Sequence, residues 1–166
     1  MDDWQDMQLF ALELIRESKP HLDRQELPNG KIMGERIAIL HLDHANELLM
    51  KSFLIKKGYV VEFLKEKQVE KGTKTDDFIK EAKTLEYEKC LDIITSKEHI
   101  PLKRESKTTI IKFHQLRNEI QHRAKYIPDD KRSRIKEFYP CLKELFGLMF
   151  PDSTPFPIIH QFENLD

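Results

Sequence analysis

Glycine and cysteine are both scarce in this chain of 166 residues. With only five glycines, glycine-rich phosphate loops and the repeated tight turns of many β-proteins are not expected. The two cysteines, Cys90 and Cys141, lie far apart and form no C-x-x-C pair. This spacing argues against a disulfide framework and favours two reduced thiols in the core of a cytoplasmic protein.

Long hydrophobic runs are also missing. No apolar stretch approaches the roughly 20 residues that a membrane-spanning helix needs. The sequence MDDWQDMQLF at the start is acidic and lacks the basic-then-apolar order of a secretory signal. Apolar residues make up 39% of the chain and charged residues 34%, which is typical of a soluble, helix-rich protein. We therefore expect a cytoplasmic protein with no membrane partner.

Charge is unevenly spread along the chain. The formal net charge is −1, which gives no overall attraction to nucleic acid. Between Lys103 and Lys136, however, there are 11 basic and 4 acidic residues, a local balance of +7 against −8 for the remainder. Such asymmetry fits a local anion site, although a solvated basic helix surface explains it equally well.

The spacing of apolar residues predicts helices and no convincing strand. The main predicted helices cover about residues 4–18, 34–57, 85–95, 108–126 and 128–150. Pro20 is expected to end the first helix and Gly58 to cap the second. The fold class is therefore all-α, a short bundle of four to five helices that forms a single domain over residues 1–150. An irregular, proline-rich tail is expected over residues 151–166.

The helix predicted over residues 108–126 has two different faces. One face is an apolar stripe that contains Phe113, Leu116, Ile120, Ala124 and Ile127. The other gathers His114, Arg117, Asn118, Gln121, His122 and Lys125. Most polar helix faces carry long charged chains, whereas this one is rich in side chains that form directional hydrogen bonds or titrate near neutral pH.

These side chains suit the cleavage of a phosphate ester. The fork of Arg117 matches phosphate oxygens and can stabilise the added negative charge of a pentacoordinate phosphorane. His122 can transfer a proton, and Asn118, one turn earlier, can hold the imidazole or a phosphate oxygen in position. Because RNA supplies its own nucleophile, the 2′-hydroxyl, this chemistry requires neither a metal ion nor another cofactor.

The spacing within this group predicts a homodimer. Arg117 and His122 are five residues apart, which separates them by about 140° around the helix. They are therefore poor partners within one chain. A second copy across a two-fold axis would bring two arginine and histidine sets around one cleft.

The segment LRNEIQHR resembles the signature of the HEPN superfamily, an arginine followed after four to six residues by a histidine. Arg117, Asn118 and His122 match it as R-N-x-x-x-H. The upstream segment AILHLDHANELLMKSFLIKKGY is similar to the family's long second helix with its acid and lysine, here Glu47 and Lys51. LEYEKCLDII is similar to its third helix, so the resemblance covers about residues 37–150.

The resemblance implies a short bundle that dimerises through the motif helix. It also implies metal-independent ribonuclease activity that leaves a 2′,3′-cyclic phosphate, in toxin–antitoxin, abortive-infection or other anti-phage systems. An antitoxin or defence-system partner protein would accompany such a role. Some toxins of this type carry a tyrosine two residues after the histidine, where this chain has Ala124. Regulation by nucleotidylation of a tyrosine is therefore not expected.

The leading interpretation is an endoribonuclease with Arg117, Asn118 and His122 as catalytic residues. His114, Gln121 and Lys125 would bind the RNA, with His114 also a candidate second base, and Glu47 would orient the active-site arginine. The alternative is a non-catalytic HEPN-type module that uses the same helix for dimerisation, nucleotide binding or interaction with a partner.

One further pattern invites a metal-site interpretation. His41, His44 and Glu47 form H-x-x-H-x-x-E, but they spread over about 120° of the helix and lack the i,i+4 histidine pair of zinc hydrolases. A polar seam against a neighbouring helix explains them better.

Overall fold

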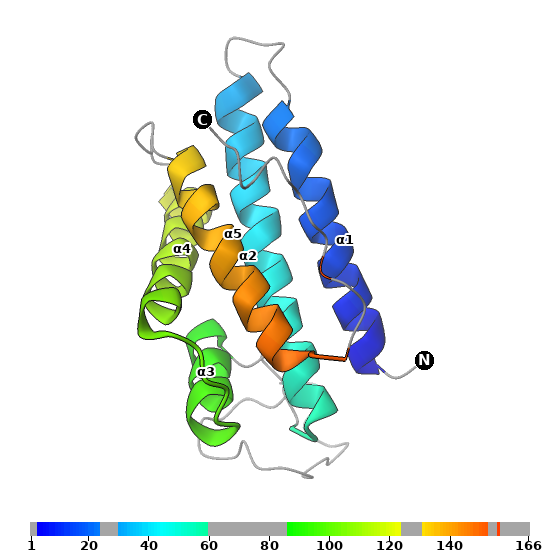
Figure 1. The fold of residues 1–166 in the computed structure, drawn as a ribbon. Helices are drawn as coiled ribbons and strands as arrows, with labels where there is room; N and C mark the ends of the chain where they lie inside the picture. The colour runs from blue at the N-terminus through cyan, green and yellow to red at the C-terminus, as the bar shows by residue number, and fades with distance from the viewer. Residues whose placement is uncertain (1–2, 24–29, 60–85, 124–130, 153–155, 157–166) are drawn as a thin grey trace.

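The structure, a computed structural model, describes residues 3–23, 30–59, 86–123, 131–152 and 156 (Figure 1). These residues form five α-helices and one short π-helical segment, and they contain no β-strand. The helices are α1 (Asp3–Asp23), α2 (Gly30–Lys56), α3 (Tyr87–Asp92), α4 (Arg104–Arg123) and α5 (Lys131–Met149), with the π-helix η2 (Ile93–Lys97) directly after α3. The predicted all-α bundle is confirmed.

The long helix α2 is the centre of the bundle. It packs against α1, α3, α4 and α5 (Figure 1), which explains why apolar residues occupy most of its circumference. Leu42, Leu49 and Leu54 are completely buried along it. Because α4 and α3 both pack against α2, the polar face of α4 is brought close to residues of two other helices.

The C-terminal end of α2 follows the predicted glycine cap. Gly58 has a φ of 84°, a conformation that glycine adopts without steric cost. Its N–H donates to the Ile55 carbonyl at 2.8 Å, and the N–H of Tyr59 donates to the Leu54 carbonyl at 2.9 Å. This pair of hydrogen bonds is the Schellman motif, so Gly58 caps α2 as the sequence indicated.

The prediction that Pro20 ends the first helix is wrong. Helix α1 continues through Pro20 to Asp23, because the extra turn is held by contacts with the rest of the protein. Leu22 is buried, and its carbonyl accepts a hydrogen bond from Arg132 of α5 at 3.4 Å. Packing of this turn outweighs the backbone hydrogen bond that the proline removes.

The contact between α1 and α2 is close enough to exclude a side chain at Gly34. A Cβ atom there would lie 1.9 Å from the His21 carbonyl oxygen. Beside it, the rings of His21 and His41 meet edge to face with centroids 5.1 Å apart. Gly34 therefore sets the separation of the two helices.

The described part of the chain locates several other sequence features. Cys90 is buried, Cys141 is partly buried, and neither forms a disulfide. Burial raises the pKa of the Cys90 thiol to about 12, which keeps it protonated in the core. Of the tail, Phe156 packs on Tyr139 and Phe146 of α5, with ring centroids 5.7 and 5.2 Å apart. Among the described helices, none combines the length and the apolar character needed to cross a membrane.

Replacing Gly34 with alanine tests the close α1–α2 contact. We expect Gly34→Ala to lower the free energy of unfolding by at least about 1–3 kcal/mol, because backbone atoms must separate to admit the methyl group. Urea denaturation followed by circular dichroism measures the change. Gly147→Ala in α5 is the matched control, since a Cβ there meets nothing within 4 Å and should stabilise the helix by about 0.5–1 kcal/mol. Equal effects of the two substitutions would contradict the packing account.

His41 makes stability depend on pH. Burial, and next the neighbouring His21, lowers the pKa of His41 below its ordinary value of 6.5, so the unfolded chain binds the proton more readily than the folded chain. This contribution to stability is therefore complete above about pH 6.5 and is lost as the pH falls through the folded-state pKa. In urea titrations we expect His41→Gln to lose less stability than wild type between about pH 7 and pH 5. A larger loss in the variant would refute this.

Candidate functional site

The polar face of α4 meets a buried carboxylate of α2. Asp43 has 0% exposure, and its Oδ2 lies 3.0 Å from Nδ1 of His114 and 3.5 Å from Nε of Arg117. A buried carboxylate is costly unless cationic or hydrogen-bonding groups surround it. Asp43 therefore holds two side chains of the motif helix at one point.

Arg117 is anchored on one side and open on the other. Its Nη1 donates a hydrogen bond to Oδ1 of Asn118 at 2.8 Å, while its Nε faces Asp43. The described residues supply no acceptor for Nη2, and 21% of the side chain is exposed. The free edge of the guanidinium can therefore receive an anion such as a phosphate.

Helix α3 supplies an aromatic wall to the site. The ring of Tyr87 stacks on the imidazole of His114, with centroids 3.9 Å apart and planes inclined by 12°. The Tyr87 hydroxyl accepts a hydrogen bond from Nδ2 of Asn46 on α2. Burial, and then the nearby carboxylate of Asp43, raises the pKa of Tyr87 well above its ordinary value. Tyr87 is therefore a neutral, fixed platform for the histidine.

Two acceptors of this cluster have no hydrogen-bond partner among the described residues. They are Oδ1 of Asp43 and Oδ1 of Asn46, and both atoms are buried. Leaving a buried acceptor unpaired costs free energy. Polar arrangements that sacrifice stability in this way occur at functional sites, and the imidazole of His41 on α2 also has a buried nitrogen that is unpaired within the described part of the chain.

The structure brings together part of the predicted site. Arg117, Asn118 and His114 lie beside one another next to α2. Gln121 is exposed on the last turn of α4. His122 lies on the backbone of α4, but its side chain is outside the described part of the protein. Lys125 is also outside the described residues.

Glu47 has a different partner from the one predicted. Its carboxylate pairs with Lys51 at 2.5 Å, and the carboxylate beside Arg117 belongs to Asp43, one turn earlier on α2. A direct role of Glu47 on the arginine stays a prediction. The contact expected of Glu47 is made in this structure by Asp43.

The sequence interpretation overlooked Asp43, Asn46 and Tyr87 as site residues. A signal for Asp43 was present, because Asp43, Glu47 and Lys51 form a narrow i,i+4 polar stripe on a helix that is otherwise apolar. No comparable signal marked Asn46 or Tyr87, since their pairing joins residues 41 positions apart.

The histidines of α2 do not gather as a metal site would require. His44 is exposed and His41 is half-buried, while Glu47 is paired with Lys51. Within the described ranges, no three His, Cys, Asp or Glu side chains lie close enough to hold one metal ion.

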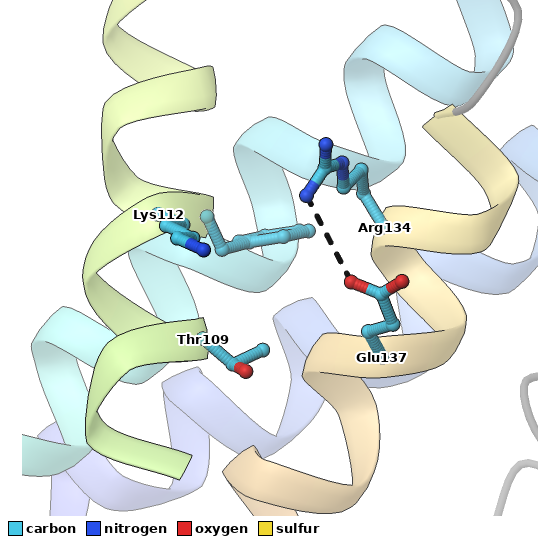
Figure 2. Close-up of a pocket in the computed structure, with 5 residues that line it drawn as sticks. Thr109, Lys112, Arg134 and Glu137 are labelled. Carbon is cyan, nitrogen blue, oxygen red and sulfur yellow. Dashed lines mark ion pairs between the residues drawn. The ribbon is translucent and has the colours of Figure 1, made fainter. Parts of the chain in front are cut away.

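A small pocket lies on the other side of α4. Figure 2 shows Thr109 and Lys112 of α4 facing Arg134 and Glu137 of α5 across it. Arg134 and Glu137 are paired at 3.9 Å, and the volume is about 70 Å³, well below the roughly 300 Å³ of small-molecule sites. None of the motif residues lines this pocket. It is therefore separate from the cluster around Asp43.

Comparison with known proteins gives no match. No family model matches the sequence, and neither the curated proteins nor the solved structures include a significant match. A function must therefore be argued from the residues and contacts of this chain alone.

Proposed function

We propose that this protein is a metal-independent endoribonuclease of the HEPN type. The observation that supports the proposal best is the open edge of Arg117, held beside His114 and Asn118 by the buried carboxylate of Asp43. A fixed guanidinium next to an imidazole is the minimum that RNA cleavage needs, because one binds the phosphate and the other moves a proton. The R-N-x-x-x-H pattern adds His122 to this set.

The proposed reaction is an internal transfer of the phosphate. The RNA 2′-hydroxyl attacks the adjacent phosphorus while a base removes its proton. The bond from phosphorus to the 5′-oxygen then breaks, and an acid protonates the departing oxygen, which leaves a 2′,3′-cyclic phosphate. Arg117 stabilises the negative charge that builds up on the phosphorane, a kind of stabilisation that is strongest where the cation is already in place.

The protein is proposed to act as a homodimer. Within one chain, positions 117 and 122 lie about 140° apart around an α-helix, so a two-fold axis near α4 would complete the site. Exposed apolar residues on α2 support this arrangement. Met33 is 57% exposed, and Ile37 and Leu40 follow it at helical spacing, only partly buried, in the turns before Asp43. A second copy would cover this face.

The proposed setting is the cytoplasm, in a toxin–antitoxin or anti-phage system with a neutralising or defence partner. A second candidate function is a non-catalytic interaction or nucleotide-binding module. It is favoured by one observation: Arg117 already makes contacts with both Asp43 and Asn118, as in a purely structural network. The two functions differ in whether RNA is cleaved or only bound.

The activity test uses purified full-length protein with end-labelled RNA in EDTA. We expect wild type to cleave RNA, to leave DNA of the same sequence intact, and to give products ending in a 2′,3′-cyclic phosphate by mass spectrometry. Arg117→Ala should lower the rate by about 10²–10³-fold and His122→Ala by about 10²–10⁴-fold.

Lys112→Ala is the matched control for the loss of a positive charge, because Lys112 is exposed on the opposite side of α4. It should cleave like wild type. Circular dichroism of every variant separates loss of chemistry from loss of folding. Folded wild-type protein that binds RNA in EDTA without cutting it would favour the interaction module.

A site shared between two subunits predicts complementation. Arg117→Ala and His122→Ala chains are each inactive alone, but a mixed dimer contains one intact site built from the arginine of one chain and the histidine of the other. After co-refolding, we expect about a quarter of wild-type activity, because about half of the dimers are mixed and each has one working site. Failure to recover activity, or a monomeric mass of 19.8 kDa in light scattering, would rule out the shared site.

A further inference from the structure

We infer that His114 is the general base of the proposed ribonuclease, with Asp43 and Tyr87 as its positioning residues. This inference rests on the proposed function and adds to it a second proton-transfer group beside His122. Cleavage by 2′-hydroxyl attack moves two protons, one from the nucleophile and one to the leaving oxygen. His114 lies on the same chain as Arg117, whereas in the proposed dimer the histidine at position 122 comes from the other subunit, so the two imidazoles are suited to different steps.

The contact with Asp43 determines which ring nitrogen of His114 carries the proton. Nδ1 of His114 lies 3.0 Å from Oδ2 of Asp43, and a carboxylate without a proton can only accept a hydrogen bond. The proton of a neutral imidazole is therefore held on Nδ1, which leaves a lone pair on Nε2. A histidine in this tautomer is ready to accept a proton, which is the role of a base.

The orientation of the ring is fixed as well. Tyr87 covers one face of the imidazole in a near-parallel stack, and Asn46 in turn holds the Tyr87 hydroxyl. The hydrogen bond to Asp43 and the stack together prevent the ring from turning about either axis. Nε2 therefore points in one direction, as efficient proton transfer requires.

The free nitrogen of His114 remains accessible. Nε2 has no hydrogen-bond partner among the described residues, and 14% of the His114 side chain is exposed. Arg117 lies one turn further along the same helix and approaches the same oxygen of Asp43. A phosphate on the open edge of Arg117 thus has its ribose within range of His114.

The proton and electron balance follows from this placement. Nε2 of His114 takes the proton from the 2′-hydroxyl as the new bond from oxygen to phosphorus forms. The bond to the 5′-oxygen breaks, and His122 gives that oxygen its proton.

The charged and titratable groups around the His114 ring are Asp43 on α2, Tyr87 on α3 and Arg117 on α4, with the Glu47–Lys51 pair one turn further along α2.

The experiment compares ordinary RNA with RNA whose scissile 5′-oxygen is replaced by sulfur. A thiolate leaves without protonation, so the sulfur substrate restores activity to a variant that lacks the acid but not to one that lacks the base. We expect His114→Gln to lower kcat by about 10²–10⁴-fold on both substrates, with KM nearly unchanged. We expect the sulfur substrate to rescue His122→Ala. The His114 variant should also lose the acidic limb of the pH–rate profile.

Asp43→Asn tests the positioning role. An amide of the same shape can donate to Nδ1 and so favours the wrong tautomer, which should lower kcat by more than tenfold and distort the acidic limb without a matching change in KM. Should this variant fail to fold, two substitutions of Tyr87 take its place. Tyr87→Phe keeps the stacked ring and is expected to retain the acidic limb of the pH–rate profile. Tyr87→Ala removes the ring and should weaken that limb. His99→Asn is the matched control, since His99 is exposed with a φ of 53° that asparagine tolerates.

The outcomes separate this inference from the proposed function. Wild-type protein that does not cleave RNA overturns both. Cleavage that needs Arg117 and His122, while folded His114→Gln keeps its kcat and its acidic limb, overturns the role of His114 alone. Rescue of His114→Gln by the sulfur substrate would show that it acts as an acid and would also overturn the assignment.

Discussion

The geometry of the candidate site depends on one buried carboxylate. Asp43 has no exposed surface and faces both His114 and Arg117, so it holds an imidazole and a guanidinium within reach of one another. Removing a carboxylate from water is unfavourable, and these two contacts offset part of that cost. The central position of α2 makes the arrangement possible, because α2 packs against both α4 and α3.

The surrounding helices give this interaction its rigidity. Gly34 allows α1 to approach α2 closely, and the cap at Gly58 ends α2 cleanly. From the other side, Tyr87 fixes the imidazole by stacking. A site built on three packed helices varies less in geometry than one built on loops. Phosphate transfer requires such a fixed geometry of the groups that bind the phosphate and transfer the protons.

The sequence predicted features that depend on local spacing. The apolar periodicity of α2 and α4 gave their approximate extent, and the glycine at position 58 gave the end of α2. Arg117 also lies close to Asn118 because the two residues are neighbours in the chain. What the sequence did not predict depends on tertiary contacts. Packing of Leu22 allows α1 to continue beyond Pro20. Asp43 contacts His114, which lies 71 positions away in the chain.

The most direct test is a crystal structure with RNA made uncleavable by a 2′-O-methyl group at the scissile nucleotide. The account predicts that the phosphate lies on the open edge of Arg117, with the ribose 2′-oxygen next to Nε2 of His114. It also predicts that the pocket between α4 and α5 stays free of RNA. Density for the phosphate in that pocket, or anywhere remote from Asp43 and its two partners, would contradict the account.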